Sequence, residues 1–294
     1  MPLYRLHGDH ELIAPTMIAA LDGWVDAGTA ATTAAGELAD GGGLVATFDG
    51  DLVFDYRARR PTLHIVDGRP GELTWPELAI RHGRLGVRDI LVLTGAEPDF
   101  RWRELADDLV SLAESLGVAE WVSLGAIPAA VPHTRPVPVL GTESRPGLLR
   151  GQVQPGPAGL LRVPAAAISV IDLAVTAAGV PAVGYFAQIP HYVSGPYPSA
   201  AVELLRALGR HLGEEVGVGD LLEEADQLKI RLSAAAAADE ATRTYVERLE
   251  AMVDEARLPS GDDLISEIER FLRDQGGPSP GGAGGAGGGG SSGG

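Results

Sequence analysis

MIAALDGWVDAGTAATTAA, the stretch from Met17 to Ala35, decides the fold of this chain. Its first five residues are apolar and predict a buried β-strand, which ends at the turn Asp22-Gly23-Trp24. An alanine- and threonine-rich stretch from Ala27 predicts a helix directly after the turn. In α/β proteins ligands gather where a strand gives way to a helix, because the helix start offers unpaired N–H groups and a partial positive charge. We therefore expect the functional site of the protein at this turn.

Apolar runs and helical patterns alternate over residues 1–213. The predicted strands are Thr16–Leu21, Leu44–Phe48, Leu52–Phe54, Thr62–Val66, Ile90–Thr94, Trp121–Ala126 and Ala182–Phe186. The predicted helices are Ala27–Ala39, Glu77–Gly83, Arg101–Leu116, Ala165–Ala178 and Pro198–Leu212. Asp49-Gly50-Asp51 is typical of a hairpin turn between two strands. The alternation predicts an α/β fold with a mainly parallel sheet flanked by helices.

Two further zones follow this core. Residues 214–275 carry only helical patterns and predict an acidic helical C-terminal subdomain. It is either a helical hairpin packed on the α/β body or a protruding arm that contacts other proteins. Residues 276–294 are rich in glycine and contain no large apolar side chain, so we expect a disordered tail.

Composition excludes several functions. The formal charge is −17, and the segment from Glu214 to Asp274 alone holds 17 acidic and 7 basic residues. Nucleic acids bind to clustered Lys and Arg, so we expect no nucleic-acid partner. Lys229 is the only lysine, which leaves almost no candidate for lysine-dependent chemistry. Cysteine is absent, so disulfides, thiolate nucleophiles and thiolate metal sites are excluded.

The sequence also gives expectations about location. No run approaches the roughly 18 uninterrupted apolar residues of a membrane-spanning helix. The N-terminus lacks the basic and apolar regions of a signal peptide. Together with the absence of cysteine, these features favour a cytoplasmic protein without a membrane partner.

The turn after the first predicted strand holds five candidate residues. Asp22 and Asp26 bracket the turn, and one of them can face a ligand or metal while the other caps the helix. The simpler interpretation is that Asp26 is only a helix cap. Gly23 and Gly28 suit a tight turn and a close helix approach. Trp24 is unusual there, since its indole must be covered by the protein body, a ligand or a partner chain.

Two more candidates follow the predicted strand Ile90–Thr94. Glu97 and Trp102 lie in the stretch LTGAEPDFRW, where α/β proteins hold reactive groups at strand ends. In that case Glu97 lines the same edge as Asp26. The alternative is that the acidic residues here simply begin the next helix, favoured by its dipole.

Two proline-stiffened loops supply the remaining candidates. His133 and Arg135 project from a loop with four prolines and can bind an anion or a partner, or can be ordinary surface groups. His191 and Tyr192 lie in the loop IPHYVSGPYP. Ser194 nearby has no GxSxG elbow, and the acidic and histidine residues near the N-terminus fit no standard metal site. We therefore expect no catalytic triad, no metal and no cofactor.

Taken as a set, these segments resemble the PAC2 family, named for a proteasome assembly chaperone, in its actinobacterial branch. The resemblance is carried by GWVDAG, by Tyr56 with Arg60-Pro61, and by LTGAEPDFRW, PHTRP, GPAGLL and PHYVSGPYPSA, which follow in one order over roughly residues 15–200. It implies an α/β core that is similar in outline to nucleoside phosphorylases and peptidyl-tRNA hydrolase-like folds, followed by a helical C-terminal addition. It also implies that the protein is oligomeric. It also implies a protein-binding role, since the eukaryotic relatives act as non-catalytic partners in proteasome assembly.

Two functions stay open on the sequence. The first is a non-catalytic, chaperone-like factor, possibly linked to the assembly of the proteasome or another protein complex, with protein partners and a homo-oligomeric state. The alternative is a nucleoside- or anion-binding enzyme whose strand-end pocket gathers Asp26, Glu97, His133, Arg135, His191 and Tyr192.

Overall fold

The computed structural model describes residues 1–8, 10–151, 153–156 and 159–256. The chain divides into a compact unit from Met1 to Glu250 and a second unit that begins at Ala251, of which residues 251–256 are described. The glycine-rich tail and the helix predicted around Leu264–Leu272 lie outside the described residues. The proposed domain boundaries at residues 213 and 275 stay predictions.

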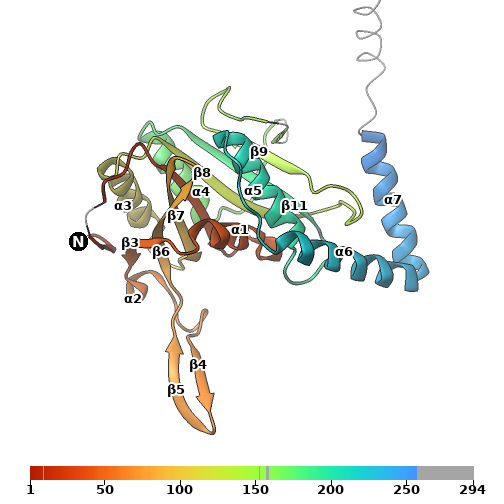
Figure 1. The fold of residues 1–294 in the computed structure, drawn as a ribbon, viewed down its shortest axis with the longest axis horizontal. Helices are drawn as coiled ribbons and strands as arrows, with labels where there is room; N and C mark the ends of the chain where they lie inside the picture. The colour runs from red at the N-terminus through yellow and green to blue at the C-terminus, as the bar shows by residue number, and fades with distance from the viewer. Residues whose placement is uncertain (9, 152, 157–158, 257–294) are drawn as a thin grey trace, which may run out of the picture. The chain divides into compact units, whose positions relative to one another are not determined.

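The first unit has an α/β fold (Figure 1). Its strands are β1 (Tyr4–Leu6), β2 (Thr16–Asp22), β3 (Gly43–Phe48), β4 (Thr62–Val66), β5 (Arg69–Thr74), β6 (Leu78–Leu85), β7 (Arg88–Ala96), β8 (Glu120–Ala129), β9 (Val139–Glu143), β10 (Gln154–Pro155) and β11 (Ala182–Pro190). The helices are a 3₁₀ turn, η1 (Ala27–Thr29), then α1 (Ala30–Ala39), α2 (Gly50–Val53), α3 (Trp102–Ser115), α4 (Ala167–Ala177), α5 (Pro198–Leu212), α6 (Leu221–Ala238) and α7 (Glu240–Ala256).

Within the described residues, nine strands form one sheet in the order β1-β3-β6-β7-β2-β8-β11-β9-β10. The four central strands β7, β2, β8 and β11 are parallel to one another. Strands β1, β3 and β6 continue the sheet by antiparallel pairing on one side, and β9 pairs antiparallel with β11 on the other. The predicted α/β class with its parallel centre is confirmed.

Helices cover both faces of this sheet. Along β2, Ile18 and Ala20 face a cluster built with α1 and α5, whereas Met17 and Ala19 face a cluster built with α3 and α4. All four side chains are fully buried. A strand that is covered on both faces needs apolar residues at every position, which explains the uninterrupted run at the start of MIAALDGW.

The segment predicted as the helix Glu77–Gly83 is a strand, and that prediction was wrong. Strand β6 pairs with β7 from Leu78 opposite Gly95 to Leu85 opposite Arg88. The two-residue loop Gly86-Val87 joins them, with Gly86 at a φ of 57° that favours glycine. The three buried residues at the start of β6 are compatible with either a helix or a strand. Hydrogen bonding to β3 and β7 stabilises the strand.

The stretch Phe48–Phe54 also differs from the prediction of a hairpin turn followed by a strand. Asp49 accepts a hydrogen bond from the backbone N–H of Asp51 at 3.1 Å and caps the short helix α2. An aspartate in front of Gly-Asp-Leu is as good a helix cap as it is a turn former, so the local sequence does not separate the two.

The predicted strand Thr62–Val66 is confirmed, but it lies outside the main sheet. It pairs antiparallel with β5, and the two strands form a separate hairpin that projects from the body below β6 (Figure 1). The turn residues Asp67 and Gly68 have φ values of 52° and 75°, as a tight hairpin requires.

Helices α6 and α7 confirm the helical character expected after residue 213. Leu221 and Leu228 of α6 pack into the cluster that α1 and α5 share. In the part of the chain that the structure describes, no helix combines the length and the apolar character needed to cross a membrane.

A partly buried carboxylate beneath the sheet gives a first prediction. Asp172 of α4 accepts hydrogen bonds from Ser123 at 2.5 Å and from the Trp121 indole at 3.1 Å, and burial raises its pKa to about 6. Because the unfolded carboxyl titrates near 4, the charged form destabilises the fold above pH 6, and stability rises as the pH falls from about 6 to 4.

We therefore expect Asp172→Asn to raise the free energy of unfolding at pH 7.5 by about 1–3 kcal/mol, since asparagine keeps the acceptor oxygen and removes the charge. Urea unfolding at pH 7.5 and pH 5 measures it, with the exposed α3 residue Asp107→Asn as a control. A gain that is equal at both pH values would contradict this account.

Candidate functional site

The candidate site lies at one edge of the sheet. Because β2, β7, β8 and β11 are parallel, the loops that follow them all leave this edge. After β2 the chain turns to α1 on one face, and after the neighbouring β7 it turns to α3 on the opposite face. This divergence between two adjacent parallel strands is where α/β sheets form ligand-binding crevices.

Glu97 holds the turn after β2 in place. One of its carboxylate oxygens accepts the backbone N–H of Trp24 at 3.0 Å, and the other accepts the N–H of Ala167, the first residue of α4, at 2.7 Å. A Cβ atom on Gly23 would lie 2.2 Å from the Glu97 carboxylate, so glycine is required there. Glu97 thus ties the first turn to the start of α4 rather than beginning α3.

Asp26 caps the first helix. One oxygen accepts the backbone N–H groups of Ala31 and Thr32 at 2.7 and 3.3 Å, and the other accepts the Thr32 hydroxyl. Burial raises the pKa of Asp26 despite these hydrogen bonds. Gly28 follows with a φ of 61°, and a Cβ there would lie 2.8 Å from Tyr197. The turn is therefore closely packed on its inner side.

The two tryptophans of the predicted site differ in exposure. Trp24 is 64% exposed at the tip of the turn. Trp102 is half-buried at the start of α3 and donates its indole N–H to the carbonyl of Pro98 at 2.6 Å. Trp24 thus offers an aromatic surface, whereas Trp102 braces the loop that carries Glu97.

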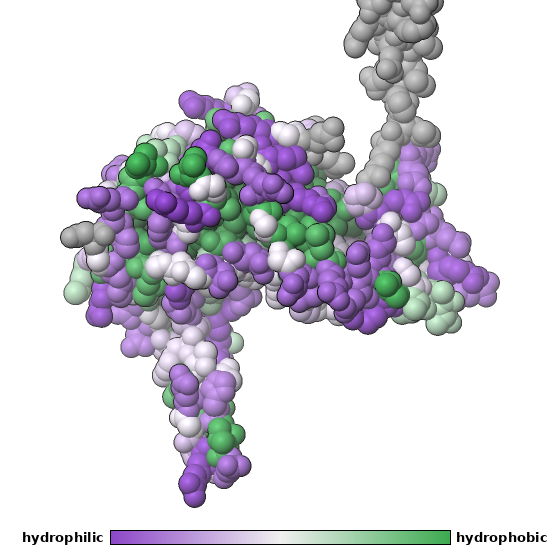
Figure 2. All heavy atoms as spheres, viewed as in Figure 1, coloured by the Kyte–Doolittle hydropathy of each residue, from purple (hydrophilic) through white to green (hydrophobic). Residues whose placement is uncertain are grey.

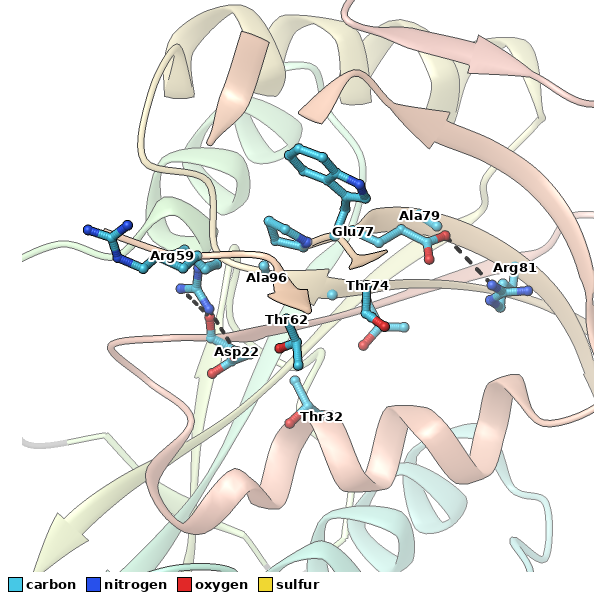
Figure 3. Close-up of a pocket in the computed structure, with 14 residues that line it drawn as sticks. Asp22, Thr32, Arg59, Thr62, Thr74, Glu77, Ala79, Arg81 and Ala96 are labelled. Carbon is cyan, nitrogen blue, oxygen red and sulfur yellow. Dashed lines mark hydrogen bonds and ion pairs between the residues drawn. The ribbon is translucent and has the colours of Figure 1, made fainter. Parts of the chain in front are cut away.

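A cavity of about 470 Å³ opens beside this turn, at the ends of β2 and β7. Two ion pairs flank it on opposite sides (Figure 3): Arg59 with Asp22 at 2.8 Å, and Arg81 with Glu77 at 3.7 Å. Threonine side chains lie between them, contributed by α1 and by the base of the hairpin: Thr32, Thr62 and Thr74. Asp22 is the one predicted site residue that lines this cavity.

The candidates from the proline-rich loops form a second group, which binds the C-terminal helices. The buried His133 ring contacts the Tyr192 hydroxyl at 2.8 Å and Ser233 of α6 at 3.2 Å. His191 contacts the Tyr245 hydroxyl of α7 at 3.2 Å. Arg135 pairs with Glu250 at 3.5 Å. These contacts involve all four candidate residues of the two loops.

The structure therefore divides the predicted residues into two groups. The turn group comprises Asp22, Gly23, Trp24, Asp26, Gly28, Glu97 and Trp102, and the loop group comprises His133, Arg135, His191 and Tyr192. Glu97 and His191 take part in separate hydrogen-bond networks. A role of either group of residues in binding stays a prediction. Within the described residues, no cluster of three or more histidine, aspartate or glutamate side chains has the geometry of a metal site.

Sequence reasoning missed most of the cavity. Arg59 precedes β4, Trp75 and Glu77 lie between β5 and β6, and Arg81 lies in β6. Only Glu77 and Arg81 belong to a predicted element, the helix Glu77–Gly83, and that prediction was wrong. One signal was present, since Asp67-Gly68 between two β-prone runs is a strong hairpin marker. It places the arginine-rich stretch before β4 at the base of that hairpin.

The Glu97 contacts predict a structural effect. Replacing Glu97 by alanine leaves the amides of Trp24 and Ala167 without their acceptor, so we expect a loss of about 1–3 kcal/mol in the free energy of unfolding. Hydrogen exchange of these two amides should accelerate in the variant, and Glu104→Ala on the exposed surface of α3 is the control. Unchanged exchange at both amides would contradict the anchoring role.

His133 predicts a pH effect. Burial lowers the pKa of His133, while Glu250 opposes and Lys229 adds to that shift. Below about pH 6.5 the unfolded chain therefore takes up a proton at this histidine that the folded protein does not take up. The free energy of unfolding then decreases as the pH decreases, by at most about 1.4 kcal/mol per pH unit. We expect His133→Gln to flatten the dependence of unfolding free energy on pH between 7 and 5. His64→Gln on the exposed hairpin should leave it unchanged.

Comparison with known proteins agrees with this architecture. A family model described as the PAC2 family matches residues 20–236. The comparison with curated proteins gives no match. A Mycobacterium tuberculosis proteasome-assembly chaperone homologue is 35% identical, with a TM-score of 0.71 over 79% of this chain and 99% of that one. A PAC2 family protein from Streptomyces avermitilis is 36% identical, with the same TM-score and coverage. A Corynebacterium glutamicum protein of unknown function is 29% identical, with a TM-score of 0.80 over 92% and 99% of the two chains. The chain therefore belongs to the PAC2 family.

Proposed function

We propose that this PAC2-family chain is a non-catalytic, chaperone-like factor that binds other proteins through its β4–β5 hairpin. The Mycobacterium tuberculosis relative that is described as a proteasome-assembly chaperone homologue supports the proteasome, or a complex assembled with it, as the partner. The observation that carries the proposal is the apolar surface of the hairpin.

Every residue of β4 and β5 is exposed, yet the hairpin is rich in large apolar side chains. The exposed fractions lie between 45% and 66% for Leu63, Ile65, Val66 and Leu73. Figure 2 shows hydrophobic residues toward the far end of this hairpin. A group of apolar side chains this large on a protruding element is typical of a protein contact, because water solvates it poorly.

The backbone of the hairpin also favours protein binding. The two strands pair with each other and with no strand of the main sheet among the described residues. The outer edge of each strand therefore presents N–H and C=O groups to solvent. A partner that adds a strand to such an edge gains main-chain hydrogen bonds as well as apolar contacts.

The polar residues of the turn and the loops support a non-catalytic role. Glu97 and Asp26 accept backbone N–H groups, and His133 is held between Tyr192 and Ser233. A general base needs a free lone pair directed at substrate, whereas these groups stabilise the fold. Self-association into a homo-oligomer belongs to the same proposal, because the exposed hairpin suits a second copy of the chain as well as another protein. We also propose a cytoplasmic location, which a chain without cysteine favours.

The test places a charge on the apolar surface. We expect the double variant Ile65→Asp, Val66→Asp to weaken binding to the proteasome core particle of the encoding organism at least about tenfold, since burying a charge in an apolar contact is unfavourable. Val87→Asp is the matched control, because Val87 is 91% exposed on the β6–β7 loop, away from the hairpin. Surface plasmon resonance measures the affinity.

Light scattering of the unaltered protein, the double variant and the Val87→Asp variant measures self-association. If the hairpin is the self-contact, the double variant alone shifts to a smaller mass. Equal binding and equal mass for all three proteins would overturn the proposed role of the hairpin.

A further inference from the structure

The cavity between β2, β7 and the hairpin base has a rigid floor. Ala96 donates its backbone N–H to the carbonyl of Glu77 at 2.8 Å, which fixes the start of β6 beside the end of β7. Gly95 permits this approach, since a Cβ there would lie 2.0 Å from the same carbonyl. The volume of about 470 Å³ lies in the range of small-molecule sites, roughly 300–1,000 Å³.

The charge around this cavity is opposite to that of the chain. Three arginines are among the residues that line it, Arg59, Arg60 and Arg81, together with the two acidic residues Asp22 and Glu77. Each carboxylate is already paired with one arginine. The positive charge of Arg60 therefore remains in excess, in a chain whose formal charge is −17. Guanidinium groups bind phosphate and carboxylate through paired N–H donors, so the cavity favours an anion.

An aromatic ring completes the site. Trp75 lines the cavity and is 51% exposed, and its ring is held by an edge contact with Tyr56 at a centroid distance of 4.8 Å. A half-exposed indole beside a cavity can stack on a planar ring of a ligand. Thr62 and Thr74 add hydroxyl groups between the charged residues and the hairpin (Figure 3).

We propose that this cavity binds a small organic anion that carries a planar ring, with Arg60 on the anionic group and Trp75 on the ring. This binding site is independent of the protein contact proposed for the hairpin, because Ile65 and Val66 do not line it. The anionic group is a phosphate or a carboxylate, which the arginines bind by the same chemistry.

Isothermal titration calorimetry on the full chain at low salt tests the site. The probes are AMP for a ring with a phosphate, indole-3-acetate for a ring with a carboxylate, and adenosine and inorganic phosphate for each half alone. We expect at least one ring-bearing anion to bind with a Kd below about 1 mM, and adenosine and phosphate to bind at least about tenfold more weakly.

Variants of exposed residues assign the binding to the cavity. Arg60→Gln and Trp75→Ala should each weaken binding at least about tenfold, while Trp75→Phe keeps an aromatic ring and should restore most of it. Arg69→Gln on the hairpin and Phe100→Ala before α3, both exposed and outside the cavity lining, are matched controls that should leave the affinity unchanged. Thermal melts verify that all five variants are folded.

Three results would overturn the proposal: no saturable binding of either ring-bearing anion, equal binding of adenosine or phosphate alone, or an affinity that Arg60→Gln does not change. Loss of proteasome binding in the Ile65, Val66 variant with unchanged anion binding would leave this site standing. Absence of anion binding together with the expected loss of proteasome binding in that variant would contradict the anion site and would support the protein contact.

Discussion

The burial of β2 at the centre of the sheet is the constraint on which the rest of this structure depends. Its residues Met17–Ala20 are fully buried, with β7 and β8 hydrogen-bonded on its two edges and helices on both faces. Such a strand meets solvent at its end, which here is Asp22. The turn that follows must reverse the chain within a few residues, so it needs Gly23, Gly28 and an external anchor. Glu97 supplies that anchor from the end of the neighbouring strand.

The sequence predicts those elements whose signals are local. Pro198 in the first turn and Gly213 at a φ of 70° after the last residue mark both ends of α5, and the prediction of Pro198–Leu212 is confirmed to the residue. The parallel strands are equally well marked, since burial on both faces leaves continuous apolar runs. The assignment fails at β6, because its short apolar start followed by polar residues fits two periods and pairing with its neighbours decides.

For the candidate site, the sequence predicts where polar groups gather but not what they do. Parallel strands bring Glu97 and His133 to one edge of the sheet whatever their role. The sequence therefore predicts that residues directly after these strands lie at that edge. Whether a carboxylate faces substrate or accepts a backbone N–H depends on which helix start lies opposite, and α4 is far from Glu97 in the sequence. The cavity was missed for the same reason, since Arg60 and Arg81 line one cavity only because the hairpin base and β6 lie close together in the fold.

The hairpin and the cavity are linked through one pair of residues. Thr62 and Thr74 are opposite each other at the base of the hairpin, and both line the cavity. Ile65 and Val66 lie beside the Asp67-Gly68 turn, three to four residues further along β4, which is about 10–13 Å for an extended strand. A protein that contacts the tip and an anion that fills the cavity therefore touch different side chains of one short ribbon. Any influence of one on the other must pass through the base of the hairpin, because the sheet beneath it is rigidly packed.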